Sequence, residues 1–300
     1  MDDRYIGRFE EDFPEKLRFI PGCPAGIYVR GELPDPGKKS VAIVGARACS
    51  EYGRKMAEYF ASHLAAAGVQ IVSGMAKGID GIAQRAALDA GGRTFGVLGS
   101  GVDVVYPAAN RDLFDRVGEQ GGLISEHPPG TAPLRSHFAS RNRIISGLCD
   151  ILLVIEARIK SGTSITVGNA LDQGRDIFAV PGRITDGLSA GCNRLISQGA
   201  GAALCPEDIM KALGMTEDDA VVTSSVKKNK SIAGSGEVMR LELGPEEKRV
   251  YECLDLYPKT VDEIVRTCRL SVSVTLEALT SLCLSGAAKE CARSHYIRSV

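Results

Sequence analysis

Glycine-rich segments with nearby arginines follow several apolar runs of this chain, and their residue types suit the binding of phosphate groups. In the first segment, Val41–Ser50, an apolar run passes into a turn of small residues and then into a helix. Such a turn directs backbone N–H groups and the positive end of the helix dipole toward an anion. Arg47 can add a bidentate contact. The alternative is a tight structural turn with a solvated arginine.

Two further glycine-rich segments follow the next apolar runs. Ser73–Gly81 again lies between a strand-like run and a helix-like run, and its Lys77 either contacts phosphate or is simply exposed. Leu98–Asp103 is a weak signal alone, but it is the third such turn. Because the carboxyl ends of parallel strands meet at one edge of an open sheet, where ligands bind, we expect these turns to lie together.

Basic residues cluster in the segment Arg135–Ile145, where Arg141 and Arg143 lie close to an expected helix start. Cations at a helix N-terminus oppose the helix dipole. Such a conflict between local preference and fold is expected mainly at functional sites. Phosphate binding would relieve it, and the alternative is that an arginine pairs with Glu126 or Glu156.

Hydroxyl and amide groups continue the pattern. Ser161–Thr163 opens a helix and can form a second anion-binding nest, while Val180–Arg183 and Gly191–Arg194 extend the same edge. The residues that we expect to contact phosphate are Gly45, Ala46, Arg47, Ser50, Ser73, Gly74, Lys77, Gly99, Gly101, Arg135, Phe138, Arg141, Asn142, Arg143, Ser161, Gly162, Thr163 and Gly182.

Patterns typical of enzymes and cofactor sites are missing from the sequence. It has no GxSxG, Walker lysine or HExxH. The first turn is not GxGxxG, and the second run ends in Ser73-Gly74 rather than in an acid for a ribose, which disfavours a nicotinamide dinucleotide. The nine cysteines form no CxxC pair, so we expect neither a metal nor another cofactor. A place for His127 and His137 near the binding edge stays open.

Composition limits the partners and the location. The chain has 300 residues and a formal net charge of −1, so any nucleic-acid site must be local rather than a generally basic surface. The absence of Trp limits base stacking. No apolar run approaches the ~20 residues that span a bilayer, and the charged N-terminus lacks a signal-peptide core. We therefore expect a cytoplasmic protein with reduced cysteines and no membrane partner.

Short apolar runs alternate with helix-length segments through most of the chain. Because the runs are apolar throughout, they are typical of parallel strands covered on both faces. The pattern predicts an α/β fold with a Rossmann-like, doubly wound, mostly parallel sheet. The expected strands are Val41–Val44, Val69–Val72, Thr94–Leu98, Leu123–Ser125, Ile151–Ile155, Ile177–Val180 and Ala202–Leu204.

Four parts of the chain are expected. Residues 1–39 are a proline-rich, extended lead-in with one short strand at Ile27–Arg30, and residues 40–214 form the Rossmann-like core. Residues 215–243 are rich in charge, serine and glycine and predict a linker. Residues 244–300 contain three helical patterns and two extended pieces, which is the winged-helix pattern.

The combined segments resemble the DNA-processing protein A family, also called DprA or Smf. The matching signatures are VAIVGARACSEYG at 41–53, SGMAKGID at 73–80, VLGSGVDVVYPAAN at 97–110, FASRNRIISG at 138–147, EARIKSGT at 156–163 and AVPG at 179–182. The resemblance covers the whole core, and the order of the motifs makes it specific. It implies a non-enzymatic protein that binds single-stranded DNA, forms a homodimer and helps load RecA recombinase during natural transformation.

The family's motifs also fit residue by residue, with three departures. The resemblance assigns Gly45 and Arg47 to the phosphate-binding turn, and the segments 138–143 and 161–163 to two further signatures. Gln84 stands where the family usually has His, Ala139 where it usually has Pro, and Ala108 where a basic residue is common. A weaker or differently routed DNA track is one reading of these departures. The N-terminal helical domain common in the family is expected to be missing or truncated.

The sequence supports two further expectations and one competing function. The last apolar run is an expected sheet edge, and Asn193, Ile196 and Ala202 are candidates for a twofold contact. The third winged-helix helix, Ser271–Ser285, has no Lys or Arg, so we expect it to contact protein rather than duplex DNA. The alternative function is a Rossmann-type nucleotide phosphoribohydrolase of the lysine-decarboxylase-like group. The PGGxGTxxE signature of that group is missing here.

Overall fold

The computed structural model describes residues 3–215 and 243–299. The chain divides into two compact units, Met1–Val226 and Lys227–Val300. The linker predicted at 215–243 lies almost entirely outside the described residues.

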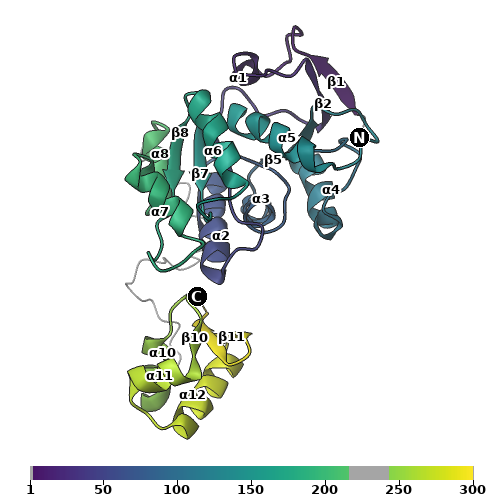
Figure 1. Cartoon of the computed structure of the whole chain (residues 1–300). Coiled ribbons are helices and arrows are strands. Elements are labelled where there is room, and N and C mark those ends of the chain that lie inside the picture. Colours follow the sequence, from purple (N-terminus) through teal and green to yellow (C-terminus); the bar gives the residue numbers. More distant parts are fainter. Residues whose placement is uncertain (1–2, 216–242, 300) are drawn as a thin grey trace. The chain divides into compact units, whose positions relative to one another are not determined.

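A nine-stranded sheet forms the centre of the larger unit (Figure 1). Its order is β1-β2-β6-β5-β4-β3-β7-β8-β9, and β3 to β9 are parallel, whereas β2 is antiparallel to β6 and β1 to β2. The strands are β1 (Arg4–Gly7), β2 (Gly26–Gly31), β3 (Ser40–Val44), β4 (Gln70–Ser73), β5 (Thr94–Leu98), β6 (Gly122–Ser125), β7 (Ile151–Val154), β8 (Asp176–Ala179) and β9 (Gly201–Ala202).

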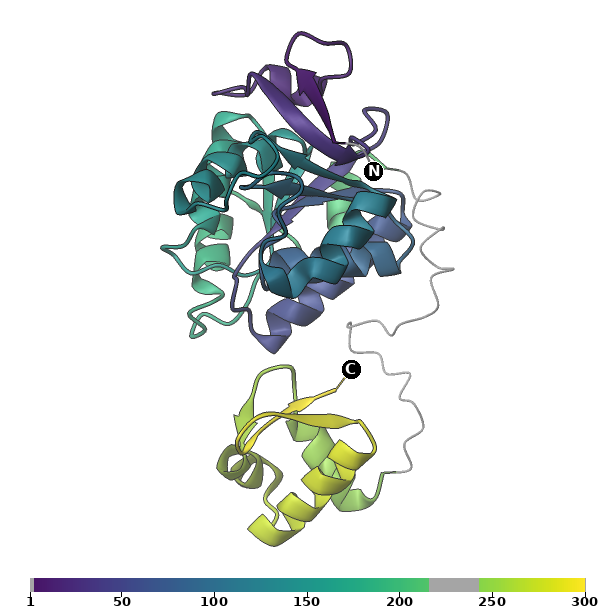
Figure 2. The same ribbon diagram turned by 90° about the vertical axis from the view of Figure 1, so that its right-hand side faces the viewer.

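Helices cover both faces of this sheet (Figure 2). They are α1 (Glu15–Arg18), α2 (Glu51–Ala66), α3 (Ile79–Asp89), the short 3-10 helix η1 (Ala108–Asn110), α4 (Arg111–Gln120), α5 (Arg135–Gly147), α6 (Thr163–Asp172), α7 (Ala190–Ser197) and α8 (Pro206–Ala212). In β3, Ala42 and Val44 pack in the cluster with α1, α5 and α6, whereas Val41 and Ile43 pack in the cluster with α2, α3 and α8. This two-sided burial explains why the strand is apolar throughout, and the predicted doubly wound fold is confirmed.

The chain reverses its direction across the sheet between β3 and β7. From β3 it winds through β4 and β5 to β6, and then crosses over to β7 beside β3 and winds outward to β8 and β9. In open parallel sheets, ligands bind outside the carboxyl ends of the strands at such a switch point. The topology therefore predicts a site at the ends of β3 and β7.

The first 39 residues are more structured than the predicted extended lead-in. Beyond the expected strand, β1 pairs with β2 as a hairpin, and α1 buries Leu17 beneath α5. Phe13 and Ile20 join the same apolar cluster. The prolines of this segment correctly predicted irregular connections between its elements. The pairing of β2 with β6 could not be predicted, because it joins residues that are distant in the sequence.

The C-terminal unit is a winged helix, as predicted. Its elements are α10 (Pro245–Cys253), β10 (Lys259–Thr260), α11 (Val261–Cys268), α12 (Val272–Leu284), β11 (Ala288–Ala292) and β12 (His295–Arg298), with the strand order β10-β12-β11. The hydroxyls of Thr260 and Ser271 cap α11 and α12, and the start of α12 agrees with the expected third helix, Ser271–Ser285. The first helix, α10, ends at Cys253 because Leu254 is extended.

No single helix of the described residues is long and apolar enough to cross a bilayer, and α11 with α12 passes that test only as a pair bent by 109°. All nine cysteines lie in the described part of the chain and are free thiols. No group of three or more potential metal ligands occurs within that part.

Candidate nucleic-acid interface

A crevice of about 650 Å³ opens at the carboxyl ends of β3 and β7, where the topology predicts a site. Its wall combines the turn after β3, the start of α3, the loops before η1 and α5, the face of α5 and the start of α6. The lining residues, hereafter the crevice, are Val44, Gly45, Ala46, Arg47, Ala76, Asp80, Tyr106, Pro133, Arg135, Phe138, Ala139, Arg141, Asn142, Ile145, Ser161, Gly162, Thr163, Ile165 and Thr166.

The turn after β3 is held tightly against the start of α3. A Cβ atom at Gly45 would lie 2.7 Å from Cγ1 of Ile79, so a side chain has no room there. Gly78 has a φ of +75°, and a Cβ atom there would collide with the carbonyl oxygen of Ala46. These close approaches fix the turn that presents Arg47 to the crevice.

The groups of this turn that can bind an anion are uncommitted. Within the described part of the chain, no hydrogen bond uses the backbone N–H groups of Ala46 or Arg47. The Arg47 side chain is exposed, and its guanidinium carbon lies 5.7 Å from the ring centroid of Phe138. A second exposed cation, Arg135, occupies the first turn of α5 and also lines the crevice. The turn therefore offers amides and cations to a phosphate.

Arg141 forms a buried part of the crevice wall. Its side chain donates hydrogen bonds to the carbonyl oxygens of Gly74, at 2.9 Å, and of Val97, and the residue is 4% exposed. Burial lowers the pKa of Arg141 to about 10, and Asp80 opposes that shift. Burial raises the pKa of the Asp80 carboxyl, while the charge of Arg141 acts in the opposite direction. Arg141 therefore stabilises the fold through its hydrogen bonds, and it also contributes positive charge to the wall of the crevice.

Arg143 does not join Arg47 and Arg141, contrary to the expectation that the three arginines converge. Its Nη2 pairs with Glu126 at 2.7 Å, and its Nε donates to the Gly22 carbonyl oxygen at 2.8 Å. The sequence placed Arg143 at a helix start, but α5 begins at Arg135. Arg143 thus lies in the third turn of the helix and faces the lead-in. The alternative pairing with Glu126 is correct.

The start of α6 supplies hydroxyl and amide groups to the crevice. Gly162 is the N-cap residue, and a Cβ atom there would meet nothing within 4 Å. The Ser161 hydroxyl is buried and has no hydrogen-bond partner among the described residues. Thr163 is 8% exposed and lines the crevice. The segment Ser161–Thr163 lies where its motif predicted.

Ser50 forms hydrogen bonds within the protein and is therefore not a phosphate contact, contrary to the prediction. Its backbone N–H donates to Oε2 of Glu156 at 2.9 Å, its hydroxyl bonds the same carboxylate, and that hydroxyl caps α2. Glu156 is fully buried at the end of β7, and burial raises the pKa of its carboxyl. This pair joins the two strands at the switch point instead of binding a ligand.

Ser73 and Gly74 are internal as well. The Ser73 hydroxyl donates to the Ile43 carbonyl oxygen at 2.6 Å, and the Gly74 amide donates to the Asp80 carboxylate at 3.2 Å. Lys77 is exposed beside the crevice, and both of its readings stand.

The remaining predicted glycines support the crevice from outside it. A Cβ atom at Gly99 would lie 2.8 Å from Cδ1 of Phe138, so Gly99 lets that ring approach the backbone. The Gly101 amide donates to a carbonyl oxygen of the loop before α5, and the Gly182 amide donates to Oδ1 of Asn193 at 3.2 Å. The Gly101 and Gly182 amides are already bonded, so the expectation that they face phosphate is wrong, whereas a phosphate contact of Gly99, which does not line the crevice, stays a prediction.

The residues that depart from the family signatures have separate explanations. Gln84 is fully buried, where it accepts from the Met75 amide and donates to the Phe95 carbonyl oxygen. It therefore takes no part in a DNA track. Ala139 is exposed and lines the crevice, whereas Ala108 is exposed in η1 outside the lining.

Sequence reasoning missed one feature of this region and left another open. Tyr106 was noted in its motif but was not proposed as a contact, although it lines the crevice and packs against Phe138. His127 and His137 stack next to the base of α5, with ring centroids 3.9 Å apart. Burial, and then the neighbouring His137, lower the pKa of His127. The sequence did offer a signal for Tyr106, because an aromatic residue directly precedes Pro107 in a glycine-rich motif.

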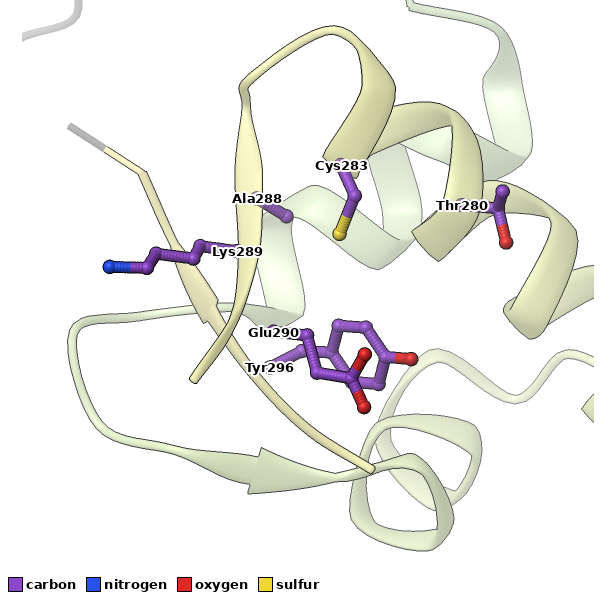
Figure 3. Close-up of a pocket in the computed structure, with 6 residues that line it drawn as sticks. All are labelled: Thr280, Cys283, Ala288, Lys289, Glu290 and Tyr296. Carbon is purple, nitrogen blue, oxygen red and sulfur yellow. The ribbon is translucent and has the colours of Figure 1, made fainter. Parts of the chain in front are cut away.

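The C-terminal unit has a smaller hollow of about 340 Å³ between α12 and β11 (Figure 3). Its lining is Thr280, Cys283, Ala288, Lys289, Glu290 and Tyr296. The Lys289 side chain extends away from Tyr296, and the Glu290 carboxylate lies beside that ring. This hollow lacks the convergent cations of the crevice.

Comparison with known proteins agrees with this arrangement. Residues 4–214 match the DNA recombination-mediator protein A family, and residues 240–292 match the DprA winged helix domain. The chain is 45% identical over 201 residues to the DNA processing protein DprA of Streptococcus pneumoniae, covering 67% of this chain and 71% of that protein. It is 40% identical over 204 residues to DprA of Bacillus subtilis, covering 68% of this chain and 69% of that protein.

Solved structures show the same relationship. The X-ray structure of the Streptococcus pneumoniae protein matches with a TM-score of 0.66 and 42% identity, covering 69% of this chain and 73% of that one. A DNA processing protein A from Helicobacter pylori, described for its single-stranded DNA binding mode, matches with a TM-score of 0.62 and 27% identity, covering 70% of this chain and 95% of that one. The chain belongs to the DNA recombination-mediator protein A (DprA/Smf) family.

Proposed function

We propose that this protein binds single-stranded DNA through the crevice, without transforming it, and passes the strand to RecA recombinase during natural transformation. The single observation that carries the DNA proposal is the convergence of Arg47, Arg135 and the uncommitted turn amides at the switch point. Family membership and the DNA-binding relative from Helicobacter pylori support it.

Charge within the crevice favours a polyanion. Asp80 supplies the one carboxylate among its described lining residues, and Arg141 opposes that charge from the same wall. Neither of the exposed cations Arg47 and Arg135 forms an ion pair with a described residue, although the charge of Arg47 also lowers the pKa of the Asp80 carboxyl. Because the chain as a whole carries a net charge of −1, attraction to DNA has to arise at such a local site.

A salt titration tests this proposal. We expect labelled single-stranded oligonucleotides to bind more tightly than the same sequence as duplex, with log K falling linearly against log salt. Each phosphate contact adds about 0.7 to that slope for single strands. The double variant Arg47→Ala/Arg135→Ala should therefore bind more weakly and lose roughly 1.4 from the slope.

Arg116→Ala is the matched control, because it also removes a cation. Arg116 pairs with Asp89 on the outside of α3 and α4, away from the crevice. It should leave both the affinity and the slope nearly unchanged. An equal loss in the control and the double variant, or no loss in either, would contradict a local phosphate site.

The proposal that the protein is not an enzyme has its own support and test. The two carboxylates nearest the switch point, Asp80 and Glu156, are buried and already hydrogen-bonded. Glu156 does not line the crevice, and Asp80, which does, is engaged by the Gly74 amide and by the charge of Arg141. Incubation with AMP should release no adenine, and release that Asp80→Asn abolishes would favour the phosphoribohydrolase instead.

Assembly and location are proposals as well. A homodimer through the β9 edge would use Ile196 and Ala202, whereas Asn193 already bonds Gly182 through both of its amide atoms. Ala202 is exposed on that edge strand. The free thiols fit a reducing cytoplasm, where RecA acts. Light scattering of wild type and Ala202→Lys tests the edge, because a lysine there should weaken the dimer.

A further inference from the structure

Tyr106 is an aromatic residue of the crevice with free surface. It lies in the loop between β5 and η1, lines the crevice and is 42% exposed. Its hydroxyl takes part in no hydrogen bond with the described residues. A large aromatic side chain left open beside cations offers a stacking surface to a flat partner.

The ring beneath Tyr106 is already packed. Phe138 lies 5.2 Å from Tyr106 between ring centroids, with the two planes inclined at 31°. Arg47 lies over Phe138, and the backbone at Gly99 approaches the edge of the same ring. Phe138 is half-buried and supports Tyr106 from one side, and Tyr106 is the more exposed of the two rings.

We propose that Tyr106 stacks on a nucleobase of the bound strand while Arg47 and Arg135 hold its phosphates. This inference rests on the proposed DNA binding and adds where the bases lie. Every base has a π-face, so such stacking is tolerant of sequence. The crevice would consequently distinguish a strand that carries bases from a bare sugar–phosphate chain.

An abasic oligonucleotide separates stacking from phosphate binding. The probes are a labelled oligothymidylate and an oligomer of the same length built from abasic sites, measured by fluorescence anisotropy. Tyr106→Leu removes the π-face but keeps an apolar side chain, and we expect about a ten-fold loss of affinity for oligothymidylate. Affinity for the abasic oligomer should stay at the wild-type value, and Tyr106→Phe should behave as wild type on both.

The outcomes distinguish this inference from the function on which it rests. If Arg47→Ala weakens both oligomers and Tyr106→Leu weakens neither, the stacking proposal fails and the phosphate site stands. An equal loss on both oligomers would also overturn stacking, because it would mean that the Tyr106→Leu substitution disturbs the phosphate site. If wild type binds neither oligomer, both proposals fall.

Photo-cross-linking supplies a second readout that does not depend on folding of a variant. An oligonucleotide with 5-iododeoxyuridine cross-links to aromatic side chains that stack on the modified base. Mass spectrometry of the wild-type protein should identify Tyr106 in the cross-linked peptide. Cross-links confined to peptides without Tyr106 would overturn the inference.

Discussion

Removing the buried Arg141 guanidinium should destabilise the larger unit far more than removing an exposed arginine. In Arg141→Met the carbonyl oxygens of Gly74 and Val97 lose their donor, and the Asp80 carboxyl loses the opposing charge. Breaking a buried charge arrangement in this way typically costs about 3–5 kcal/mol. For a unit of this size, where each kcal/mol shifts Tm by roughly 2–4 °C, Tm should fall by about 10 °C.

Thermal unfolding followed by circular dichroism measures this effect, with hydrogen exchange of β3–β5 assigning the transition to the larger unit. Arg116→Met is the matched control, since its pair with Asp89 is largely exposed and worth at most about 1 kcal/mol. A change in Tm of less than about 2 °C in Arg141→Met would refute the structural role of this arginine.

The loss of stability in Arg141→Met should also depend on pH, because Asp80 titrates. Burial raises the pKa of Asp80 and Arg141 opposes the rise, so loss of Arg141 raises that pKa further. A carboxyl whose folded pKa is raised costs stability once the pH exceeds its unfolded value of about 3.9. Arg141→Met should therefore fall further below wild type as the pH rises, and Asp80→Asn in the same chain should remove that dependence.

Three further outcomes are expected. Gly78→Ala should destabilise the protein and weaken DNA binding, because the added Cβ atom would collide with the Ala46 carbonyl oxygen. Gly91→Ala is the control for the positive φ alone: its φ is +78° and nothing lies within 4 Å of the added Cβ atom, so the free energy of unfolding should fall by only about 1 kcal/mol. The pKa of His127 is lowered in the folded protein, so the unfolded state binds the proton more tightly and the free energy of unfolding should fall as the pH drops through about 6.5. Chemical denaturation measured over this pH range should show a smaller fall for His127→Asn. A 244–300 fragment should show no salt-dependent binding to duplex DNA in a mobility-shift assay, because α12 carries no Lys or Arg; such binding would contradict the expected protein contact.

Local sequence predicted the parts of this fold that local physics determines. Apolar runs predicted the seven parallel strands, and the signal is strongest for β3 to β7 because these strands are buried throughout, whereas the edge strand β9 is exposed at Ala202. Likewise, the turn at Gly45–Arg47 lies in the crevice because parallel strands end at one edge.

Whether a predicted residue is free to contact DNA depends on partners that are distant in the sequence. Arg143 pairs with Glu126 and the Gly22 carbonyl, and Ser50 is taken by Glu156, so both leave the proposed contact set. Arg141 sits two residues from Arg143 yet faces the opposite way, into the sheet. Such differences depend on where α5 begins, which its weak N-terminal signal concealed.

Amide hydrogen exchange with and without a saturating single-stranded oligonucleotide tests the central claim most directly, because it locates the contact. We expect the strand to slow exchange at the Val44–Arg47 turn, at the start of α5 and at the Ser161–Thr163 segment, while the β1–β2 hairpin and α4 stay unchanged. Slower exchange confined to the hairpin, to α4 or to the winged-helix unit, with the crevice turns unaffected, would contradict the account.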